Sequence, residues 1–403
     1  MFKKRFTIAA AVLLCGFLTV RAAQGKTLSA LEAAQLRGAA EKGDAEAQWH
    51  VGVCYQFGFG VKKDLKQAVI WYRKSAEQGN AKAQFNLGCC YYRGEGVEKD
   101  FEQAVHWFRK AAEQGSDRAL LWMGMCYGRG EGVEKDEKQA VYWLRRAAEK
   151  GEPWGQLNLG ACLWRGAGIK KDPVEAVKWF RKAADKKNAM AQGCMGIAYM
   201  SGCGVEENPV EAVKYLRESV AGGCSKSQIN LGWCHDFGFG VERDRKKAAE
   251  YFRKPAEEGV KEAQYKLAYH YLRGWGVEKN PVRAVELLRK SAAQGYSPAE
   301  FGLGWCYEFG WGVKKNIERA AMWYTQAANN DIDKDVVPPV EMERRRKIAE
   351  FALARVTYKI GVCHETGSDG KEKDVEAAAG YYHYAAALGY EPAKEALKRL
   401  GYY

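Results

Sequence analysis

The sequence has little of the side-chain chemistry that most enzyme sites need. Histidine occurs only six times in 403 residues, and no H-E-x-x-H or other paired zinc-ligand spacing is present. No G-x-S-x-G motif occurs, and no serine or cysteine has a neighbouring base in a known catalytic signature. We therefore expect no metal, no cofactor and no catalytic activity.

A hydrophobic run long enough to cross a membrane is also missing. The apolar stretch at the N-terminus, Ile8 to Val20, is shorter than the roughly 20 residues that a span needs. Lys3 to Arg5 precede it, and Val20-Arg21-Ala22 forms a small-residue cleavage site. The pattern predicts a cleaved signal peptide over 1–22, no membrane span in the mature chain, and a periplasmic or secreted bacterial protein. An uncleaved anchor, or one lipidated at Cys15, is the alternative.

What the sequence does have is glycine at a fixed period. A Gly-x-Gly element followed by Val or Ile recurs every 36 residues without drift. The first glycines of eight copies are Gly58, Gly94, Gly130, Gly166, Gly202, Gly238, Gly274 and Gly310, and a ninth, altered copy begins at Gly367. A period of this length is typical of a solenoid, whose function usually resides on its stacked surface.

One repeat, residues 80–115, predicts two antiparallel helices. Ala83 and Leu87 belong to a series at helical spacing, and Gly94 is placed to end that helix. Asp100 is then placed to cap a second helix. The connection between them is short, so the unit is a helix hairpin.

A further glycine recurs inside the predicted first helix. It occupies Gly52, Gly88, Gly124, Gly160, Gly196, Gly232, Gly304 and Gly361. Glycine in a helix interior costs about 1 kcal/mol relative to alanine. Its recurrence at one position of the repeat predicts that a neighbouring helix approaches too closely for a side chain.

Seven cysteines share the position four residues before the turn glycine: Cys54, Cys90, Cys126, Cys162, Cys234, Cys306 and Cys363. Equivalent positions in stacked helices lie roughly 8–10 Å apart. A disulfide needs Cα atoms at about 4.4–6.8 Å. We therefore expect buried thiols that pack as small residues. The irregular cysteines, Cys89, Cys194, Cys203 and Cys224, leave one disulfide open.

The whole motif, A-x-A-Q-x-x-L-G-x-x-Y-x-x-G-x-G-V-x-x-D-x-x-x-A-x-x-W-[YF]-x-K-A-A-x-x-G, closely resembles the Sel-one-like repeat, a relative of the tetratricopeptide repeat. The resemblance covers residues 44–389, with local departures such as Lys187 and Asp331 in place of the closing glycine. It implies an all-α fold, a right-handed α-solenoid of antiparallel helix pairs. Some cysteine-rich members of the family have been linked to penicillin or peptidoglycan binding, but this chain lacks their cysteine pattern.

These features divide the chain into six segments. They are the signal peptide (1–22), an N-terminal capping helix (23–43), eight repeats (44–331), a charged insertion (332–352), a ninth, divergent repeat (353–389) and a C-terminal capping helix (390–403). Caps are expected because an end repeat has no neighbour to cover its apolar face. The insertion is either a docking element or a tolerated surface excursion.

Basic residues recur just before the glycine turns, at Arg93, Arg129, Arg165 and Arg273. Compensation of the helix dipole explains them, and a basic ladder for an acidic partner is the alternative. The formal net charge is +13, but basic side chains are interleaved with acidic ones. We therefore expect no nucleic-acid partner.

Bulky residues on the predicted first helix indicate a groove for a partner. The positions nine and five before the turn glycine lie on one face, and their residues stay bulky while their type varies. The predicted groove residues are Trp49, Phe85, Leu121, Ile229, Trp233, Tyr265, Tyr269, Phe301 and Trp305. Trp233, Tyr269 and Trp305 form the best cluster, and Phe59, Phe239, Trp275 and Trp311 in the turns form a second edge. Packing between repeats is the alternative.

The sequence thus predicts a non-catalytic scaffold or adaptor that holds a protein or peptide partner on the concave face of a solenoid. We expect a monomer. One alternative is a wall-active protein, β-lactamase-like or peptidoglycan-binding, and another is a secreted effector that engages host proteins.

Overall fold

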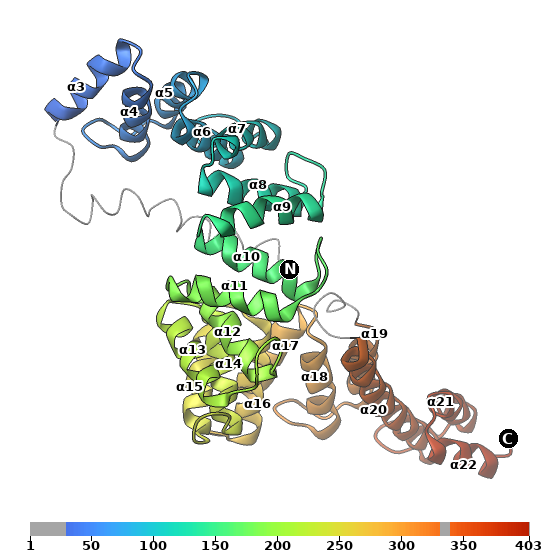
Figure 1. The fold of residues 1–403 in the computed structure, drawn as a ribbon. Helices are drawn as coiled ribbons and strands as arrows, with labels where there is room; N and C mark the ends of the chain where they lie inside the picture. Colours follow the sequence, from blue (N-terminus) through green and yellow to red (C-terminus); the bar gives the residue numbers. More distant parts are fainter. Residues whose placement is uncertain (1–29, 331–338, 403) are drawn as a thin grey trace. The chain divides into compact units, whose positions relative to one another are not determined.

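The computed structural model describes residues 30–330 and 339–402, and in these ranges every regular element is a helix (Figure 1). The predicted signal peptide, residue 331 and residues 332–338 of the predicted insertion lie outside the described residues. The all-α fold of consecutive helix pairs is confirmed.

Within the described ranges, nine helix pairs follow one another. Their first helices are α4 (Ala45–Phe57), α6 (Ala81–Arg93), α8 (Asp117–Arg129), α10 (Pro153–Arg165), α12 (Ala189–Ser201), α14 (Ser225–Phe237), α16 (Lys261–Arg273), α18 (Ser297–Phe309) and α20 (Pro339–Thr366). Their second helices are α5 (Leu65–Glu77), α7 (Phe101–Glu113), α9 (Glu137–Glu149), α11 (Pro173–Asp185), α13 (Pro209–Ala221), α15 (Arg245–Glu257), α17 (Pro281–Ala292), α19 (Ile317–Asn329) and α21 (Val375–Ala387). Single helices, α3 (Ala30–Glu41) and α22 (Glu391–Arg399), precede the first pair and follow the last.

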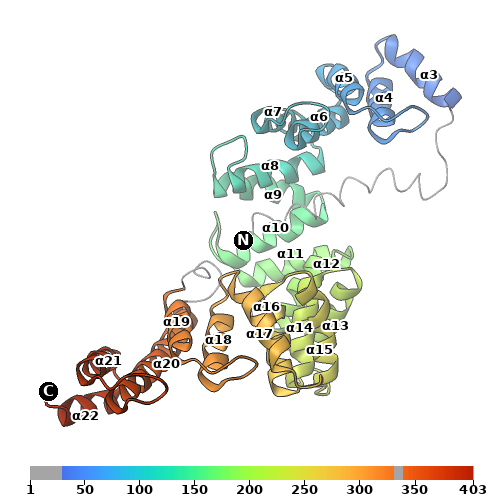
Figure 2. The same cartoon turned by 180° about the vertical axis from the view of Figure 1, so that it is seen from behind.

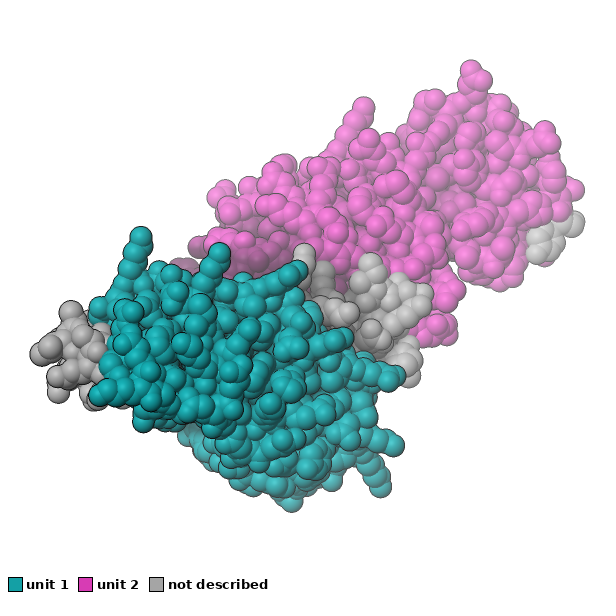
Figure 3. Space-filling view, turned by 90° about the horizontal axis from the view of Figure 1, so that it is seen from above, with its two compact units in different colours: residues 1–191, 203–205 teal, residues 192–202, 206–403 magenta. Residues whose placement is uncertain are grey.

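The helices form two compact units (Figure 3). Unit 1 comprises residues 1–191 and 203–205, and unit 2 comprises residues 192–202 and 206–403. Within each unit a second helix packs both against its own first helix and against the first helix of the next pair. Examples are α4, α5 and α6 in unit 1 and α14, α15 and α16 in unit 2 (Figure 2). Packing is therefore local along the chain, as in a solenoid.

The two glycines of each turn are required for different reasons. Gly94 ends α6 at φ 72°, and its N–H donates to the carbonyl of Cys90 at 2.9 Å. Gly96 has φ 73°, and a Cβ there would lie 2.1 Å from the carbonyl oxygen of Leu65, the first residue of α5. Six later turns make the same approach, at Gly132, Gly168, Gly204, Gly240, Gly276 and Gly312. Each of these turns therefore contacts the backbone of the preceding repeat.

The glycine inside eight of the nine first helices allows the close approach to the paired helix that the sequence predicts, and α16 has Ala268 in its place. A Cβ at Gly88 would lie 2.7 Å from the ring of Phe108 and 3.2 Å from the carbonyl oxygen of Ala104, both on α7. Phe108 is completely buried. The large side chain of the second helix thus occupies the space that the missing side chain leaves.

In three repeats a tyrosine replaces this buried Phe or Leu. The first helix of each of these repeats also has an acceptor for the tyrosine hydroxyl. The pairs are Tyr72 with Gln56 at 2.6 Å, Tyr324 with Glu308 at 2.9 Å, and Tyr382 with Glu365 at 2.6 Å. In each case the hydroxyl donates to a residue at the same position of the first helix. Because a buried hydroxyl without a partner is costly, the tyrosine and its acceptor occur together.

A buried carboxylate joins α18 to α20. The side chain of Glu308 is 1% exposed and accepts hydrogen bonds from Arg355 and Lys359 of α20, each at 2.8 Å. Burial by itself raises the pKa of Glu308, but hydrogen bonds from Lys359, Tyr324 and Arg355 outweigh it and leave the pKa lowered. Helix α20 has 28 residues in place of the usual 13, because residues 339–352 of the predicted insertion continue into the first helix of the ninth pair. Ion pairs fix this long helix to α18.

The seven cysteines at the repeated position are free thiols, as predicted. Burial raises the pKa of Cys90 and Cys126 to about 12. These thiols stay protonated at neutral pH and pack as small apolar groups. Cys89, Cys203 and Cys224 are free as well, so none of these three forms the disulfide that the spacing left open.

Replacing Gly96 by alanine should cost far more stability than replacing Gly79. Both residues have positive φ, so each variant carries a backbone strain of about 1–2 kcal/mol. Only at Gly96 does the new methyl group meet backbone atoms, because nothing lies within 4 Å of a Cβ at Gly79. We expect urea unfolding to show a total loss of about 3 kcal/mol or more for Gly96→Ala. Equal losses in the two variants would contradict the contact between turn and helix.

Glu308→Gln should destabilise unit 2 in a pH-dependent way. The stabilisation by ionised Glu308 is complete above the unfolded-state pKa of about 4.3 and disappears as the pH falls through the lower folded-state pKa. We expect a loss of about 2–4 kcal/mol at pH 7 that shrinks toward about pH 3, measured by denaturant unfolding followed by circular dichroism. Glu286→Gln, at an exposed position of α17, is the matched control and should change stability by less than about 0.5 kcal/mol. A loss that does not vary with pH would refute the role given to the ionised carboxylate.

Candidate interaction surface

The predicted groove residues nine before the turn are largely packing residues. Phe85 is 5% exposed and Leu121 is 2% exposed. The ring of Phe85 lies 5.8 Å from that of Phe108 on the paired helix. The other members, Trp49, Ile229, Tyr265 and Phe301, are partly buried against the core. At Phe85 and Leu121, packing between helices is therefore the correct interpretation, because their side chains have almost no free surface.

The predicted groove residues five before the turn, Trp233, Tyr269 and Trp305 of unit 2, are by contrast partly exposed and lie among other aromatic side chains. Trp233 lies 5.0 Å from Phe237 and 5.6 Å from Phe239, measured between ring centroids. The spacing of four residues places Trp233 and Phe237 on one face of α14. The glycine turn then folds the chain back, and the N–H of Phe239 donates to the carbonyl of Cys234 at 2.9 Å. Phe237 is 58% exposed.

The same trio recurs two repeats later. Trp305 lies 6.2 Å from Phe309 and 5.1 Å from Trp311, and the last two rings are 5.9 Å apart. Phe309 is 47% exposed, and the ammonium group of Lys359 lies 5.7 Å from its ring centroid. Large apolar rings thus reach solvent at equivalent places of two repeats.

In the repeat between them an arginine replaces the exposed phenylalanine. The guanidinium of Arg273 lies 5.3 Å from the ring of Tyr269 and 5.5 Å from the ring of Trp305, so it bridges α16 and α18. Its Nη2 donates to the hydroxyl of Tyr269 at 3.2 Å. Arg273 is exposed, and within the described part of the chain it pairs with no carboxylate. The ring of Trp275 lies 5.4 Å from that of Tyr269.

We call this set the aromatic–arginine surface. It consists of Trp233, Phe237, Phe239, Tyr269, Arg273, Trp275, Trp305, Phe309 and Trp311, all in unit 2. Three of these residues were predicted as groove residues, and three more as turn residues that contact a partner. Phe237, Phe309 and the stacking role of Arg273 were not predicted. Their spacing of four residues from Trp233, Trp305 and Tyr269 is the signal that indicates them.

The other arginines that precede a turn have different surroundings. Arg93 pairs with Glu95 at 3.6 Å, and Arg129 pairs with Glu131 at 3.4 Å. The Nε of Arg165 donates to a backbone carbonyl of its own helix at 3.2 Å. Where Glu95 and Glu131 stand in their turns, the repeat of Arg273 has Trp275. The charges of Arg93 and Arg129 are thus balanced within their own repeats, and that of Arg273 is not.

A cluster of largely buried polar and charged side chains packs against Trp275. The guanidinium of Arg245 lies 3.7 Å from the Trp275 ring centroid, and Nδ1 of His270 is 2.7 Å from the Trp275 carbonyl oxygen. Asp236 is buried and lies 3.5 Å from His270 and 3.9 Å from Arg245. These contacts hold the indole in place before any partner arrives, which lowers the entropy cost of binding.

Two further findings limit what the described residues can do. Within residues 30–330 and 339–402, no group of three or more His, Cys, Asp or Glu side chains is arranged to hold a metal ion. None of the helices in these ranges combines the length and the apolar character that a membrane crossing requires.

Comparison with known proteins gives matches along most of the chain. The Sel1 repeat family matches residues 45–80, 81–116, 117–152, 155–188, 190–224, 225–260, 261–296, 297–332 and 354–390. The chain is similar to a protective antigen present in uropathogenic Escherichia coli strains that displays an SLR fold, with 34% identity and a TM-score of 0.65, over 92% of this chain and 82% of that one. It is also similar to a Sel1 repeat protein from Oxalobacter formigenes, with 34% identity and a TM-score of 0.56, over 60% of this chain and 96% of that one. No curated protein matches. Repeat folds of this kind generally serve as scaffolds for protein interactions and are typically non-catalytic.

Alanine variants of a buried and of a partly exposed residue of the predicted groove should lose different amounts of stability. Leu121→Ala should cost about 2–5 kcal/mol, because it leaves a cavity in the core. Trp305→Ala, at a partly exposed position, should cost about 1 kcal/mol. Denaturant unfolding of each variant measures the difference. If Trp305→Ala proves as costly as Leu121→Ala, Trp305 is a core residue and not part of a binding surface.

Proposed function

Because the chain belongs to the Sel1 repeat family, we propose that it is a non-catalytic adaptor that binds a protein or peptide partner on its aromatic–arginine surface. The observation that carries this proposal is the exposed, unpaired guanidinium of Arg273 between the rings of Tyr269 and Trp305. Trp, Tyr and Arg are the residues most enriched among binding hot spots.

The exposed rings supply the apolar part of this binding site. Phe237 and Phe309 expose about half of their side-chain surface, and each lies beside a tryptophan held in the same trio. Single exposed apolar side chains are common on protein surfaces, but neighbouring exposed rings that form one patch are typical of an interaction site. A partner that covers them gains apolar burial at roughly 25 cal/mol per Å².

The charge of the surface indicates the chemistry of the partner. Arg273 has no carboxylate of its own, and Lys359 adds a second cation beside Phe309. A carboxylate of the partner would pair with Arg273 in surroundings partly shielded from water by Tyr269 and Trp305, where charge-assisted hydrogen bonds are strong. We therefore propose a segment with apolar anchors on both sides of an acidic residue.

We also propose that the adaptor works in the bacterial periplasm or outside the cell, on the basis of the signal-like N-terminal segment. Neither the wall-active, β-lactamase-like or peptidoglycan-binding activity nor the effector role has an observation in its favour among the described residues.

Affinity capture with matched variants tests the surface. The variant Trp233→Ala/Tyr269→Ala/Trp305→Ala should lose at least roughly 90% of the specifically captured partner, because it removes three hot-spot side chains. The control Ile70→Ala/Tyr142→Ala/Met322→Ala removes three exposed apolar side chains elsewhere and should retain it. Quantitative mass spectrometry of the captured proteins is the measurement.

A charge-reversal variant tests the role of Arg273. Arg273→Glu should weaken binding of the captured partner by at least about tenfold, and Arg253→Glu, on an exposed position of α15, should not. If the triple variant stays folded and retains every partner, the assignment of the surface fails.

A further inference from the structure

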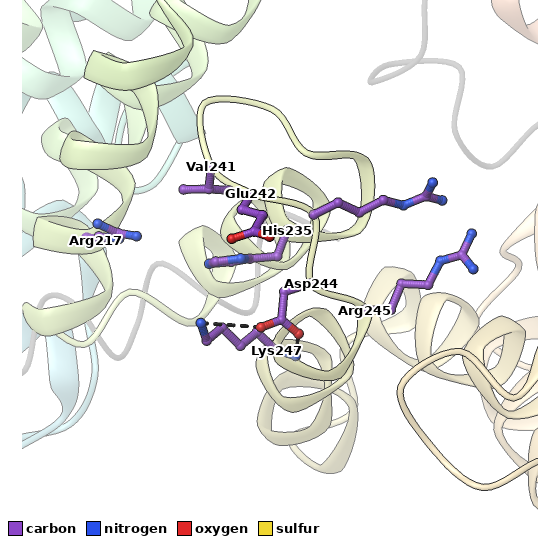
Figure 4. A pocket seen from close by; sticks show the side chains of 8 residues that line it. Arg217, His235, Val241, Glu242, Asp244, Arg245 and Lys247 are labelled. Carbon is purple, nitrogen blue, oxygen red and sulfur yellow. Dashed lines mark hydrogen bonds and ion pairs between the residues drawn. The ribbon is translucent and has the colours of Figure 1, made fainter.

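A polar pocket of about 520 Å³ lies at α13, α14 and the start of α15 in unit 2 (Figure 4). Arg217 of α13, His235 of α14 and Lys247 of α15 line it from three different helices. In Figure 4 the imidazole of His235 lies between Arg217 and Lys247. The aromatic–arginine surface contributes none of the residues that line this pocket.

His235 is a buried polar side chain whose hydrogen bonding is incomplete. It is 5% exposed, and its ring stacks on that of Tyr251 with centroids 5.6 Å apart. Its Nδ1 has no hydrogen-bond partner among the described residues. A buried polar atom without a partner is costly, so a group that protonates this ring or orders its surroundings stabilises the site.

The cations around the pocket are only partly neutralised. Within the described residues Arg217 forms no ion pair and no hydrogen bond. Lys247 lies 3.3 Å from Asp244, but Asp244 also accepts the backbone N–H groups of Lys246 and Lys247 as the cap of α15. Its negative charge is therefore shared with the helix N-terminus. Glu242 also lines the pocket, so two acidic side chains face the four basic side chains of Arg217, Arg243, Arg245 and Lys247.

Two further arginines of the lining are engaged elsewhere. The Nε of Arg243 donates to the carbonyl of Asp236 at 2.9 Å, and Arg245 stacks on Trp275. The donors that remain for a ligand are the guanidinium of Arg217, the ammonium of Lys247 and the imidazole of His235. Three donors around one space suit a tetrahedral oxyanion, which offers more acceptor oxygens than a carboxylate.

We propose that this pocket binds an oxyanion of the phosphate or sulfate class, held by Arg217, His235 and Lys247. The pocket is larger than a free anion requires. It therefore has room for a free anion or for the phosphate group of a small ester. This proposal does not rest on the partner proposed for the aromatic–arginine surface, because none of the three donors belongs to that surface.

Binding at this pocket is coupled to the protonation of His235. Burial lowers the pKa of His235, and the charges of Lys247 and Arg217 lower it further, against the opposing effects of Asp244 and the Glu242 backbone. Tyr251 faces the ring from α15, and the side chains of Glu242 and Arg243 face the pocket from the connecting loop. The free ring is thus mainly neutral at pH 7. A bound anion favours the protonated ring, so affinity for sulfate should rise as the pH falls.

NMR titration of the full isotope-labelled chain tests the site, with the amide signals of residues 241–247 as the readout and sulfate replacing chloride at constant ionic strength. We expect saturable shifts with a dissociation constant of about 1 mM or below. Affinity should be at least about threefold tighter at pH 6 than at pH 8. His235→Gln should bind with little dependence on pH.

The matched charge variants are Arg217→Gln and Arg253→Gln, both at exposed positions. Arg217→Gln should weaken sulfate binding by at least about tenfold, and Arg253→Gln should change it by less than about twofold. O-phosphoserine that binds more tightly than inorganic phosphate would identify the ligand as an ester, and equal affinities would identify a free anion. Shifts that do not saturate, or equal losses in the two variants, would overturn the proposal.

Discussion

The stack depends on one backbone contact, which seven Gly-x-Gly turns make with the first residue of the second helix in the preceding repeat. At Gly96 a Cβ would lie 2.1 Å from the carbonyl oxygen of Leu65, so no other residue fits. The glycine inside the first helix sets the distance to the paired helix in the same way, as at Gly88. Because both contacts are made at positions without side chains, the period cannot drift, and the residues around them are free to differ between repeats.

Units 1 and 2 differ in how they surround the arginine that precedes the turn. Arg93 is paired with a glutamate in its own turn, whereas Arg273 lies between Tyr269 and Trp305 and has no acidic neighbour. The difference arises at the middle residue of the turn, which is Glu95 in one repeat and Trp275 in the other. Unit 1 also has Cys89 and Met125 at the positions equivalent to Tyr269 and Trp305. Several side-chain differences on an unchanged backbone thus leave Arg273 stacked on aromatic rings and without an ion pair.

The helices and their ends could be predicted because they depend on local chemistry. Asp100, for example, caps its helix by accepting the N–H of Gln103 at 3.0 Å. Burial of individual bulky residues could not be predicted, because Phe85 is covered by the side chain of Phe108, which lies on another helix. The pocket at His235 was missed for a related reason. Its three donors are separated along the chain and meet only when three helices pack.

Hydroxyl-radical footprinting of the chain, alone and with its captured partner, tests the central claim that a rigid repeat backbone presents the side chains of unit 2 to a protein. Oxidation of Phe237, Trp305 and Phe309 should be high in the free chain and fall on binding. Oxidation of Tyr142, which is exposed in unit 1, should not change. If the partner protects unit 1 and leaves Phe237, Trp305 and Phe309 as reactive as before, the aromatic–arginine surface is not the binding site.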